Sequence, residues 1–518
     1  MAQATLLKRG AYHDSVALLT LARALRARPG VREAAVVMGT PANRDLLAQA
    51  GLLTEEAGTA TPNDLVVVVD AETPAGAEAA AAAAEPLLAR SAPRGQADRP
   101  RPRTTAGAIR RMPEANLALI SVPGAFAAVE ARTALSAGLN VILFSDNVSL
   151  ADEIALKRQA TAGGLLLMGP DCGTAYVADV PLGFANAVPP GRVGLVAASG
   201  TGLQQVATLL AGRGRGLSHA IGVGGRDMSE AVGGIMTLAA LDLLAANAAT
   251  ELIVVIGKPP APAVDERIRA KLAGLGKPVV ACLLGRNVIV GREGPVTTVA
   301  TLEDAALAAD AVLAGTAWQP RVFSVPDVSR RIAEARRDLG SGQSAVLGLY
   351  AGGTLAHESV LILEPLLGPV ASTLSDGEGR HRVLDLGADE FTVGRAHPML
   401  DPTTRVDMIG RASEQADLAV LLLDVVLGHG AAADPAGDVA PALEATRAAA
   451  RARGRGLAVV ASVVGTAGDP QGLAAQVARL EAAGAWVLPS NAQAARAAAA
   501  IAGGETVVTA LLRPGARA

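Results

Sequence analysis

The sequence predicts a multi-domain α/β protein built from doubly wound parallel sheets, about three of them. Short apolar runs recur along the chain, such as NDLVVVVD at 63–70 and TELIVVIGK at 250–258. Each is followed by a turn and a longer stretch rich in Ala and Leu. Fully apolar strands that alternate with helices are typical of parallel sheets covered on both faces. A chain of 518 residues is also too long for one hydrophobic core.

The remaining strands follow the same rhythm. We expect them, in order, at 32–39, 115–124, 140–146, 164–170, 191–200, 218–225, 277–285, 344–353, 416–428, 456–465 and 485–490. Two stretches interrupt this order. Residues 71–107 mix an Ala/Glu helix with the polar, Pro- and Arg-rich piece SAPRGQADRPRPRTT, and the second stretch is GTAWQPRVFSVPD at 315–327. We interpret the first as a mobile insert and the second as an interdomain linker. The predicted domains are 1–190, with a mobile insert at about 75–105, then 191–318 and 319–518.

Composition and charge exclude several classes of protein. A net charge of −3 and only 2% aromatic residues argue against a nucleic-acid binder, which needs a basic face or stacking platforms. Cys172 and Cys282 cannot form a disulfide framework, so we expect a reducing, cytoplasmic setting. No signal peptide is evident, and no uninterrupted apolar run reaches the roughly 18 residues of a membrane helix. We therefore expect neither nucleic acid nor a membrane as partner.

The best candidate for a binding site follows the strand at 191–200. This strand runs into Ser-Gly-Thr-Gly and then a helix. A helix N-terminus at the carboxyl end of a parallel strand presents backbone N–H groups and a positive dipole end. Glycine lets the backbone approach a ligand, and the hydroxyl groups can cap the helix or donate to an anion. Ordinary helix capping is the alternative. We predict phosphate or carboxylate binding by Ser199, Gly200, Thr201 and Gly202.

Two more strand ends of the same domain carry suitable groups. Gly224, Gly225 and Arg226 follow the strand at 218–225, and an arginine can bind an oxyanion through two hydrogen bonds. Lys258 ends the strand at 250–258 and could neutralise charge on a leaving group. A turn with a surface arginine and a solvated lysine are the alternatives. We predict the first three as anion ligands and Lys258 as catalytic.

The third domain holds the densest polar cluster, between residues 385 and 405. A histidine that precedes a proline in a loop can act as a general acid or base. A loop held by its own ion pairs is the alternative. We predict Asp389 and Arg405 as substrate-binding residues and Arg395 and His397 as catalytic ones. His429, at another strand end, is more typical of a surface histidine.

Metal and nucleotide motifs are not evident. The histidines lie far apart, without metal-ligand spacing, at positions 13, 219, 357, 381, 397 and 429. We find neither a Walker A loop nor a serine-hydrolase elbow. We therefore expect no metal site.

The order of motifs from 164 to 285 resembles the α subunit of succinyl-CoA synthetase. The matching segments are MGPDCG at 168–173, GRVGLVAASGT at 191–201, IGVGG at 221–225, ELIVVIG at 251–257 and KPVV at 277–280. In that family the Ser-Gly-Thr helix faces the active-site phosphate. The resemblance implies a Rossmann-like CoA-binding-type domain, followed by two flavodoxin-like domains of the succinyl-CoA synthetase type.

Over its whole length the chain resembles the FdrA family, with RGAYHDS at 9–15, DLGADEF at 385–391 and HPM at 397–399. That family implies oxamate carbamoyl transfer, in which carbamoyl phosphate and oxamate interconvert with oxalurate and phosphate. It also implies two further subunit types and a place in purine and allantoin catabolism. The resemblance therefore implies a small anionic substrate and an oligomer. It leaves CoA open as a cofactor and implies no nucleotide on this chain.

The sequence departs from the synthetases at the sites that their chemistry needs. Segment 291–299 lacks the histidine that they phosphorylate, and Lys258 stands where they carry an acidic residue. Tyr12–Ser15 replaces their Gly-rich CoA loop, and no ATP-grasp domain is evident. We therefore predict a carbamoyl- or acyl-phosphate transferase subunit. An NDP-forming acyl-CoA synthetase subunit and a non-catalytic ligand-binding scaffold are the alternatives.

Overall fold

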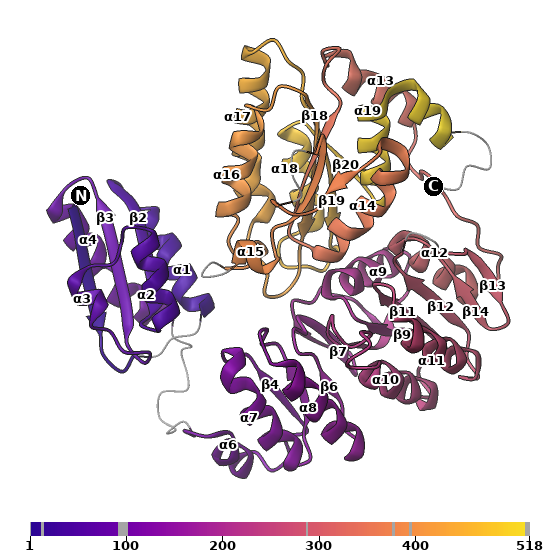
Figure 1. Cartoon of the computed structure of the whole chain (residues 1–518), viewed down its shortest axis with the longest axis horizontal. Helices are drawn as coiled ribbons and strands as arrows, with labels where there is room; N and C mark the ends of the chain where they lie inside the picture. The colour runs from indigo at the N-terminus through magenta and orange to yellow at the C-terminus, as the bar shows by residue number, and fades with distance from the viewer. Residues whose placement is uncertain are drawn as a thin grey trace. The chain divides into compact units, whose positions relative to one another are not determined.

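The structure, a computed structural model, describes residues 2–11, 15–91, 102–285, 288–375, 379–392 and 396–512. It divides into two compact units. The smaller unit comprises Met1–Arg101 and Asp389–Asp401, and the larger comprises Pro102–Ala388 and Pro402–Ala518. Figure 1 traces the chain through both. The predicted boundaries at 190/191 and 318/319 do not coincide with this division and stay a prediction.

The smaller unit contains an antiparallel sheet, where the sequence predicted a parallel one. Its strands lie in the order β1-β3-β2, and β3 pairs antiparallel with both neighbours. The strands are β1 (Ala2–Lys8), β2 (Val31–Met38) and β3 (Leu65–Ala71). Its helices are α1 (Ser15–Arg26), α2 (Pro41–Gln49), α3 (Glu55–Gly58), α4 (Pro74–Ala82), α5 (Ala84–Ser91) and α15 (Asp389–Thr392).

The apolar sequence of β3 has a different cause from the one we inferred. Every residue of β3 is buried. Val67 and Val69 pack in one hydrophobic cluster with α1, while Val66 and Val68 pack in another, on the other face of the sheet. A central strand covered on both faces is apolar whether its neighbours run parallel or antiparallel to it. The pattern therefore predicted the burial correctly but not the strand direction.

Part of the predicted mobile insert is helical. Residues 74–91 form α4 and α5, and Ala77, Ala80 and Ala81 of α4 are buried. Small side chains let α4 pack closely on β1 and β3. Residues 92–101 of the predicted insert lie outside the described residues.

The larger unit begins with a parallel sheet in the order β4-β5-β6. Its strands and helices are α6 (Thr105–Arg111), β4 (Leu117–Ile120), α7 (Gly124–Ser136), β5 (Asn140–Leu143), α8 (Leu150–Ala162) and β6 (Leu167–Met168).

The second sheet of this unit is parallel in its centre and antiparallel at its edges. Its order is β13-β14-β12-β11-β9-β10-β7-β8, and β14, β12, β11, β9 and β10 are mutually parallel. The strands are β7 (Thr174–Val177), β8 (Val180–Gly183), β9 (Pro190–Ala197), β10 (Leu217–Gly222), β11 (Leu252–Gly257), β12 (Val279–Leu283), β13 (Gly291–Glu293) and β14 (Val296–Thr298). The helices are α9 (Gly200–Gly212), α10 (Ile235–Ala246), α11 (Pro262–Ala273) and α12 (Leu302–Leu313).

The third sheet is parallel throughout, in the order β16-β17-β15-β18-β19-β20. Its strands are β15 (Ala345–Tyr350), β16 (Val370–Ala371), β17 (His381–Asp385), β18 (Leu418–Val426), β19 (Ala458–Val464) and β20 (Ala485–Leu488). The helices are α13 (Val328–Arg337), α14 (Gly353–Leu367), α16 (Thr403–Ala412), α17 (Pro435–Ala452), α18 (Leu473–Ala482) and α19 (Asn491–Leu512). The prediction of an α/β protein with mostly parallel sheets is thus confirmed.

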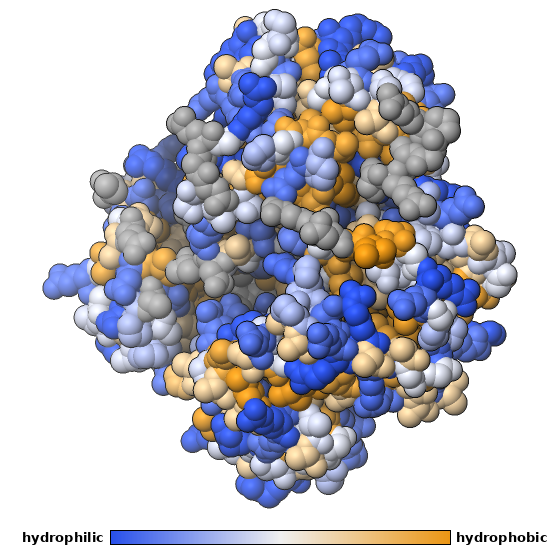
Figure 2. All heavy atoms as spheres, turned by 45° about the vertical axis from the view of Figure 1, so that its right-hand side comes forward, coloured by the Kyte–Doolittle hydropathy of each residue, from blue (hydrophilic) through white to orange (hydrophobic). Residues whose placement is uncertain are grey.

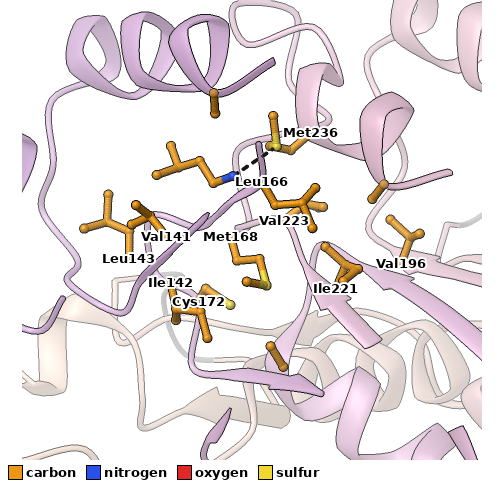
Figure 3. Close-up of a cluster of buried hydrophobic side chains, with 14 of the residues drawn as sticks. Val141, Ile142, Leu143, Leu166, Met168, Cys172, Val196, Ile221, Val223 and Met236 are labelled. Atoms are coloured by element: carbon orange, nitrogen blue, oxygen red, sulfur yellow. Dashed lines mark hydrogen bonds between the residues drawn. The ribbon is translucent and has the colours of Figure 1, made fainter. Parts of the chain in front are cut away.

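The first two sheets of the larger unit share one hydrophobic core. Figure 3 shows Val141 of β5 and Met168 of β6 in one cluster with Ile221 of β10 and Met236 of α10. The Leu167 N–H also donates to the Met236 sulfur at 3.4 Å. The core therefore continues across the predicted boundary at residue 190.

One helix and a few surface residues of the larger unit are unusually apolar. Helix α19 is long and apolar enough to cross a membrane, but 61% of its most apolar window is buried inside the protein. It packs on α14 and β18, as a core helix does. Figure 2 shows hydrophilic side chains over much of one face, with hydrophobic patches among them. Among exposed apolar residues, Phe126 and Val129 of α7 are each 65% exposed.

Candidate anion site at two facing helix N-termini

Helix α9 begins as the sequence predicted. Strand β9 is apolar to Ala197, and the Ser199 hydroxyl then accepts the Gly202 N–H at 2.9 Å, which caps the helix. A side chain at Gly202 would stand 2.5 Å from Ser199 Oγ, so glycine is required for this close turn. The N–H groups of Gly200 and Thr201 make no hydrogen bond to any described residue. These two donors are available to an anion.

Neighbouring strand ends lie at the same edge of the sheet. Because β11, β9 and β10 are adjacent and parallel, Lys258, Ser199 and Gly225 all follow strands that end at this edge. The Ala198 N–H donates to the Ile256 carbonyl at 2.9 Å, which keeps β9 and β11 paired up to the turn. Lys258 is exposed, and its ammonium group forms no ion pair with the described residues. A Cβ at Gly225 would meet open space.

A second helix N-terminus, which the sequence analysis missed, meets the first. Helix α14 follows β15 through Ala351, Gly352 and Gly353, and the Thr354 hydroxyl lies 2.5 Å from the Ser199 hydroxyl. The positive ends of α9 and α14 therefore face each other. The signal was present: Ala-Gly-Gly-Thr after an apolar strand has the same character as Ser-Gly-Thr-Gly after β9.

Carboxylates lie at the N-terminus of α14, and one of them accepts the backbone N–H groups that precede the helix. Asp424 of β18 accepts the Ala351 N–H at 2.8 Å and the Gly352 N–H at 2.7 Å. Asp385, at the end of β17, lies so close to Gly353 that a Cβ there would overlap its Oδ2. The site is therefore asymmetric: α9 offers free N–H donors for an anion, while carboxylate acceptors from β17 and β18 lie at the N-terminus of α14.

Arg405 of α16 binds Asp424, the carboxylate at the N-terminus of α14. Its Nη1 donates to the Asp424 carbonyl at 2.7 Å, and its Nη2 donates to Asp424 Oδ1 at 2.6 Å. Both side chains are buried. The guanidinium is thus bound to an internal carboxylate, where the sequence predicted a substrate oxyanion.

The Arg226 guanidinium also binds groups of the protein itself, although its side chain is 47% exposed. Its Nη2 lies 2.8 Å from Glu153 Oε2 and donates to the Val148 carbonyl at 2.8 Å. Glu153 and Asp227 in turn hold the buried Lys157 ammonium, each at 2.8 Å. Gly224, at φ +84°, packs so closely on Pro170 that a Cβ would overlap its carbonyl. This loop therefore joins α8 to the second sheet, although Gly225 and the Arg226 side chain still face solvent.

The remaining predicted residues lie elsewhere. His397 is in the smaller unit, where its Nδ1 accepts the Met399 N–H at 3.2 Å. Arg395 lies outside the described residues, as does the side chain of Asp389, the first residue of α15. The structure assigns Arg405 to the larger unit. The cluster predicted at 385–405 is thus divided between two units, and the roles of Asp389, Arg395 and His397 stay predictions.

Two buried polar contacts hold α9 and α14 in this arrangement. Asn186 donates to the Leu427 carbonyl at 2.9 Å and to Asp469 at 2.8 Å, and it accepts from Gln204 of α9 at 3.1 Å. Glu358 of α14 accepts the Leu302 N–H at 2.7 Å. Burial, as the largest cause, raises the pKa of Glu358 to about 7.

Two family models match separate parts of the chain. Residues 1–103 match a family model described as AllF, heavy metal-associated domain, and residues 349–501 match one described as CoA-ligase. The chain is similar to the uncharacterized protein YahF of Escherichia coli K12. The two are 39% identical over 495 residues, which cover 94% of this chain and 96% of YahF.

More distant similarity extends to ligase subunits. The α subunit 2 of succinate–CoA ligase [ADP-forming] from Archaeoglobus fulgidus is 29% identical over 190 residues, 35% of this chain and 63% of that one. The α subunit from Staphylococcus epidermidis RP62A is 28% identical over 184 residues, 34% of this chain and 59% of that one. The chain thus spans about three-fifths of these subunits.

Among solved structures, a dinucleotide-forming acetyl-coenzyme A synthetase 1 from Ca. Korarchaeum cryptofilum in its apo form aligns with 77% of this chain and 84% of its own. That match has 16% identity and a TM-score of 0.32.

Proposed function

Because this chain belongs to the family of YahF, CoA-ligase proteins that resemble the α subunit of succinyl-CoA synthetase and carry an AllF heavy-metal-associated N-terminal domain, we propose that it is a subunit of a transferase acting on an activated phosphate. The proposed reaction is carbamoyl transfer between carbamoyl phosphate and oxamate in ureide breakdown. The resemblance to the FdrA family and the AllF description support this choice. We further propose a cytoplasmic oligomer with two other subunit types.

The observation that carries the proposal is the pair of facing helix N-termini at Ser199 and Thr354. The free N–H groups of Gly200 and Thr201 would hold the phosphate of carbamoyl phosphate. The oxamate amide nitrogen attacks the carbamoyl carbon, the carbon–oxygen bond to phosphate breaks, and the amide proton leaves to a base. Charge then accumulates on the departing phosphate, and Lys258, at the same sheet edge, would stabilise it.

A carboxylate beside the N-terminus of α14, at the end of β17, suits the other end of the substrate. Carbamoyl phosphate and oxamate both carry N–H donors, which a carboxylate can accept. Asp385 lies against Gly353, next to the Thr354 hydroxyl that meets Ser199. We therefore include Asp385 in the proposed site as the acceptor for a substrate N–H group.

An acyl-CoA synthetase subunit is the second candidate, because residues 349–501 match the CoA-ligase model and the α subunits of succinate–CoA ligase are relatives. CoA would then be a substrate of this chain and its partners. Facing helix N-termini would serve an acyl phosphate equally well. The two candidates differ in what they consume.

A product assay separates them. The chain, copurified with its partner subunits, is incubated either with oxalurate and phosphate or with succinate, ATP and CoA. We expect ¹³C-labelled oxalurate to yield carbamoyl phosphate, about 100-fold more slowly in Lys258→Ala. Lys271→Ala, which removes a surface ion pair with Asp242, is the matched control and should keep the rate. Formation of succinyl-CoA without carbamoyl phosphate would replace the proposal with the synthetase.

A further inference from the structure

The first 103 residues match a heavy metal-associated domain, yet their donor set is poor in ligands for such a metal. Heavy metals and zinc in proteins are bound mainly by thiolate and imidazole. Both cysteines of the chain lie outside this segment, at Cys172 and Cys282, and its one histidine is His13. Of its two methionines, Met1 and Met38, the second is buried in the core beneath α1. Thiol coordination is thus impossible here.

Asp64 is the most buried carboxylate among the described residues of the segment, and both of its oxygens already accept hydrogen bonds from the protein. Asp64 is 4% exposed, and its Oδ1 accepts the Gly10 N–H at 2.8 Å. Its Oδ2 accepts both the N–H and the hydroxyl of Thr61 at 2.8 Å. The Thr61 N–H is the largest cause that lowers the pKa of Asp64, so this carboxylate is ionised at neutral pH. Its hydrogen bonds hold the residues where β1 ends and the connection to α1 begins.

The other buried carboxylate among the described residues of the segment, Asp70, has few potential metal ligands around it. Asp70 is 9% exposed, and its Oδ1 has no hydrogen-bond partner among the described residues. Its cross-strand neighbours are Gln3 and Glu33, and Glu33 lies 2.6 Å from Arg26 in an ion pair. The described part of the chain contains no group of three or more His, Cys, Asp or Glu residues that could hold a metal ion. Asp70 and a Glu33 that is already paired with Arg26 make a weak ligand set, with neither thiolate nor imidazole.

We infer that the N-terminal module of this chain holds no heavy metal, and that Asp64 fixes the end of β1 in its place. The module has its elements in the order β1-α1-β2-α2-α3-β3-α4-α5, with a core on both faces of β3. Its stability therefore comes from packing and from the Asp64 hydrogen bonds, not from coordination.

Metal analysis of the full chain tests the first half. The purified protein is equilibrated with Zn²⁺, or with Cu⁺ under reducing conditions, against a competing chromophoric chelator, and bound metal is counted. We expect well under one equivalent and an unchanged melting temperature with chelator. One equivalent that His13→Ala or Asp70→Asn releases would overturn the inference. Metal that both single variants retain would also overturn it, because other carboxylates of the module, such as Glu33, remain as donors.

Thermal unfolding of two variants tests the second half. Asp64→Asn loses charge-assisted hydrogen bonds to Gly10 and Thr61 and should melt several degrees below the wild type. Asp45→Asn changes an exposed carboxylate on α2 and should melt with the wild type. Equal melting temperatures for both variants would show that Asp64 does not organise the module.

Discussion

At the scale of single residues, the Ser199 hydroxyl connects two roles. It caps α9 through the Gly202 N–H and touches the Thr354 hydroxyl at the start of α14. The sequence analysis singled out Ser199 because a buried strand led into a Ser-Gly-Thr-Gly turn. It included Asp385 in the polar cluster at 385–405 but could not place Asp385 or Asp424 beside α14, because that proximity depends on strand order in the third sheet. The same limit applies to Arg226 and Arg405, whose partners are distant in sequence.

The cysteines give a prediction at this scale. Cys172 and Cys282 are both buried, and burial raises the pKa of Cys172 to about 12 and that of Cys282 well above its usual range. A protonated, enclosed thiol reacts slowly. We expect no thiol of the native chain to react with Ellman's reagent at pH 8, and both to react after denaturation. A rapid native reaction of either thiol would contradict this burial.

Glu358 predicts how stability depends on pH. Its carboxyl ionises near pH 4.3 in an unfolded chain but at about 7 in the fold. Between these values the folded chain binds the extra proton, so the free energy of unfolding falls as pH rises from about 4.3 to 7. The change is on the order of 3 kcal/mol.

Denaturant unfolding between pH 5 and 8 measures this effect. In Glu358→Gln the fall with pH should be smaller than in the wild type, whatever the variant's stability at any one pH. Glu444→Gln, on the exposed face of α17, should keep the wild-type slope. Identical slopes in all three proteins would mean that Glu358 ionises normally.

At the scale of elements, a glycine stands in the first turn of α9 (Gly202) and of α14 (Gly353), where a Cβ would overlap a neighbouring side chain. Gly353 is the first residue of α14, and a Cβ there would overlap Asp385 Oδ2. We expect Gly353→Ala to cost about 1–3 kcal/mol, because the overlap, at a half-buried position, must be relieved by moving the helix or the carboxylate.

Gly410→Ala is the matched control. Gly410 lies on α16, where a Cβ meets nothing within 4 Å. Alanine is the better helix former, so this variant should gain about 0.4–1 kcal/mol. Chemical unfolding compares the two, and a stabilising Gly353→Ala would mean that Asp385 does not pack against α14.

The elements also show what sequence patterns can predict. The strands of the parallel sheets were found because apolar runs alternate with Ala-rich helices. Strand β3 was found too, but its direction was not, since burial on both faces produces the same apolar run in either case. The Ala/Glu helix expected within 71–107 is present as α4 and α5, but the mobile insert predicted from about 75 overlaps it, because the Ala-rich segment runs into a polar, Pro-rich one.

At the scale of the whole molecule, buried polar contacts join parts of the larger unit that are distant in sequence. Asn186 makes side-chain hydrogen bonds to Leu427, Asp469 and Gln204. Composition alone cannot identify such a residue, because an asparagine in a loop is usually exposed.

Removing this contact should weaken the unit measurably. Asn186→Ala leaves Asp469, Gln204 and the Leu427 carbonyl short of a partner, at a cost of about 3 kcal/mol. Asn116→Ala, at an exposed position, should cost less than about 0.5 kcal/mol. Equal midpoints of urea unfolding for Asn186→Ala, Asn116→Ala and the wild type would show that the Asn186 hydrogen bonds do not stabilise the unit.

The central claim is that an anion binds where α9 and α14 meet, and calorimetry of carbamoyl phosphate with the full chain and its partner subunits tests it most directly. Ser199→Ala and Ser149→Ala each remove a serine that caps a helix of the larger unit, at a cost of about 1 kcal/mol of stability. We predict that Ser199→Ala binds carbamoyl phosphate about tenfold more weakly, because it removes the cap that holds the Gly200 and Thr201 N–H groups in place. Ser149→Ala should bind as the wild type does, and equal affinities in all three proteins would place the anion elsewhere.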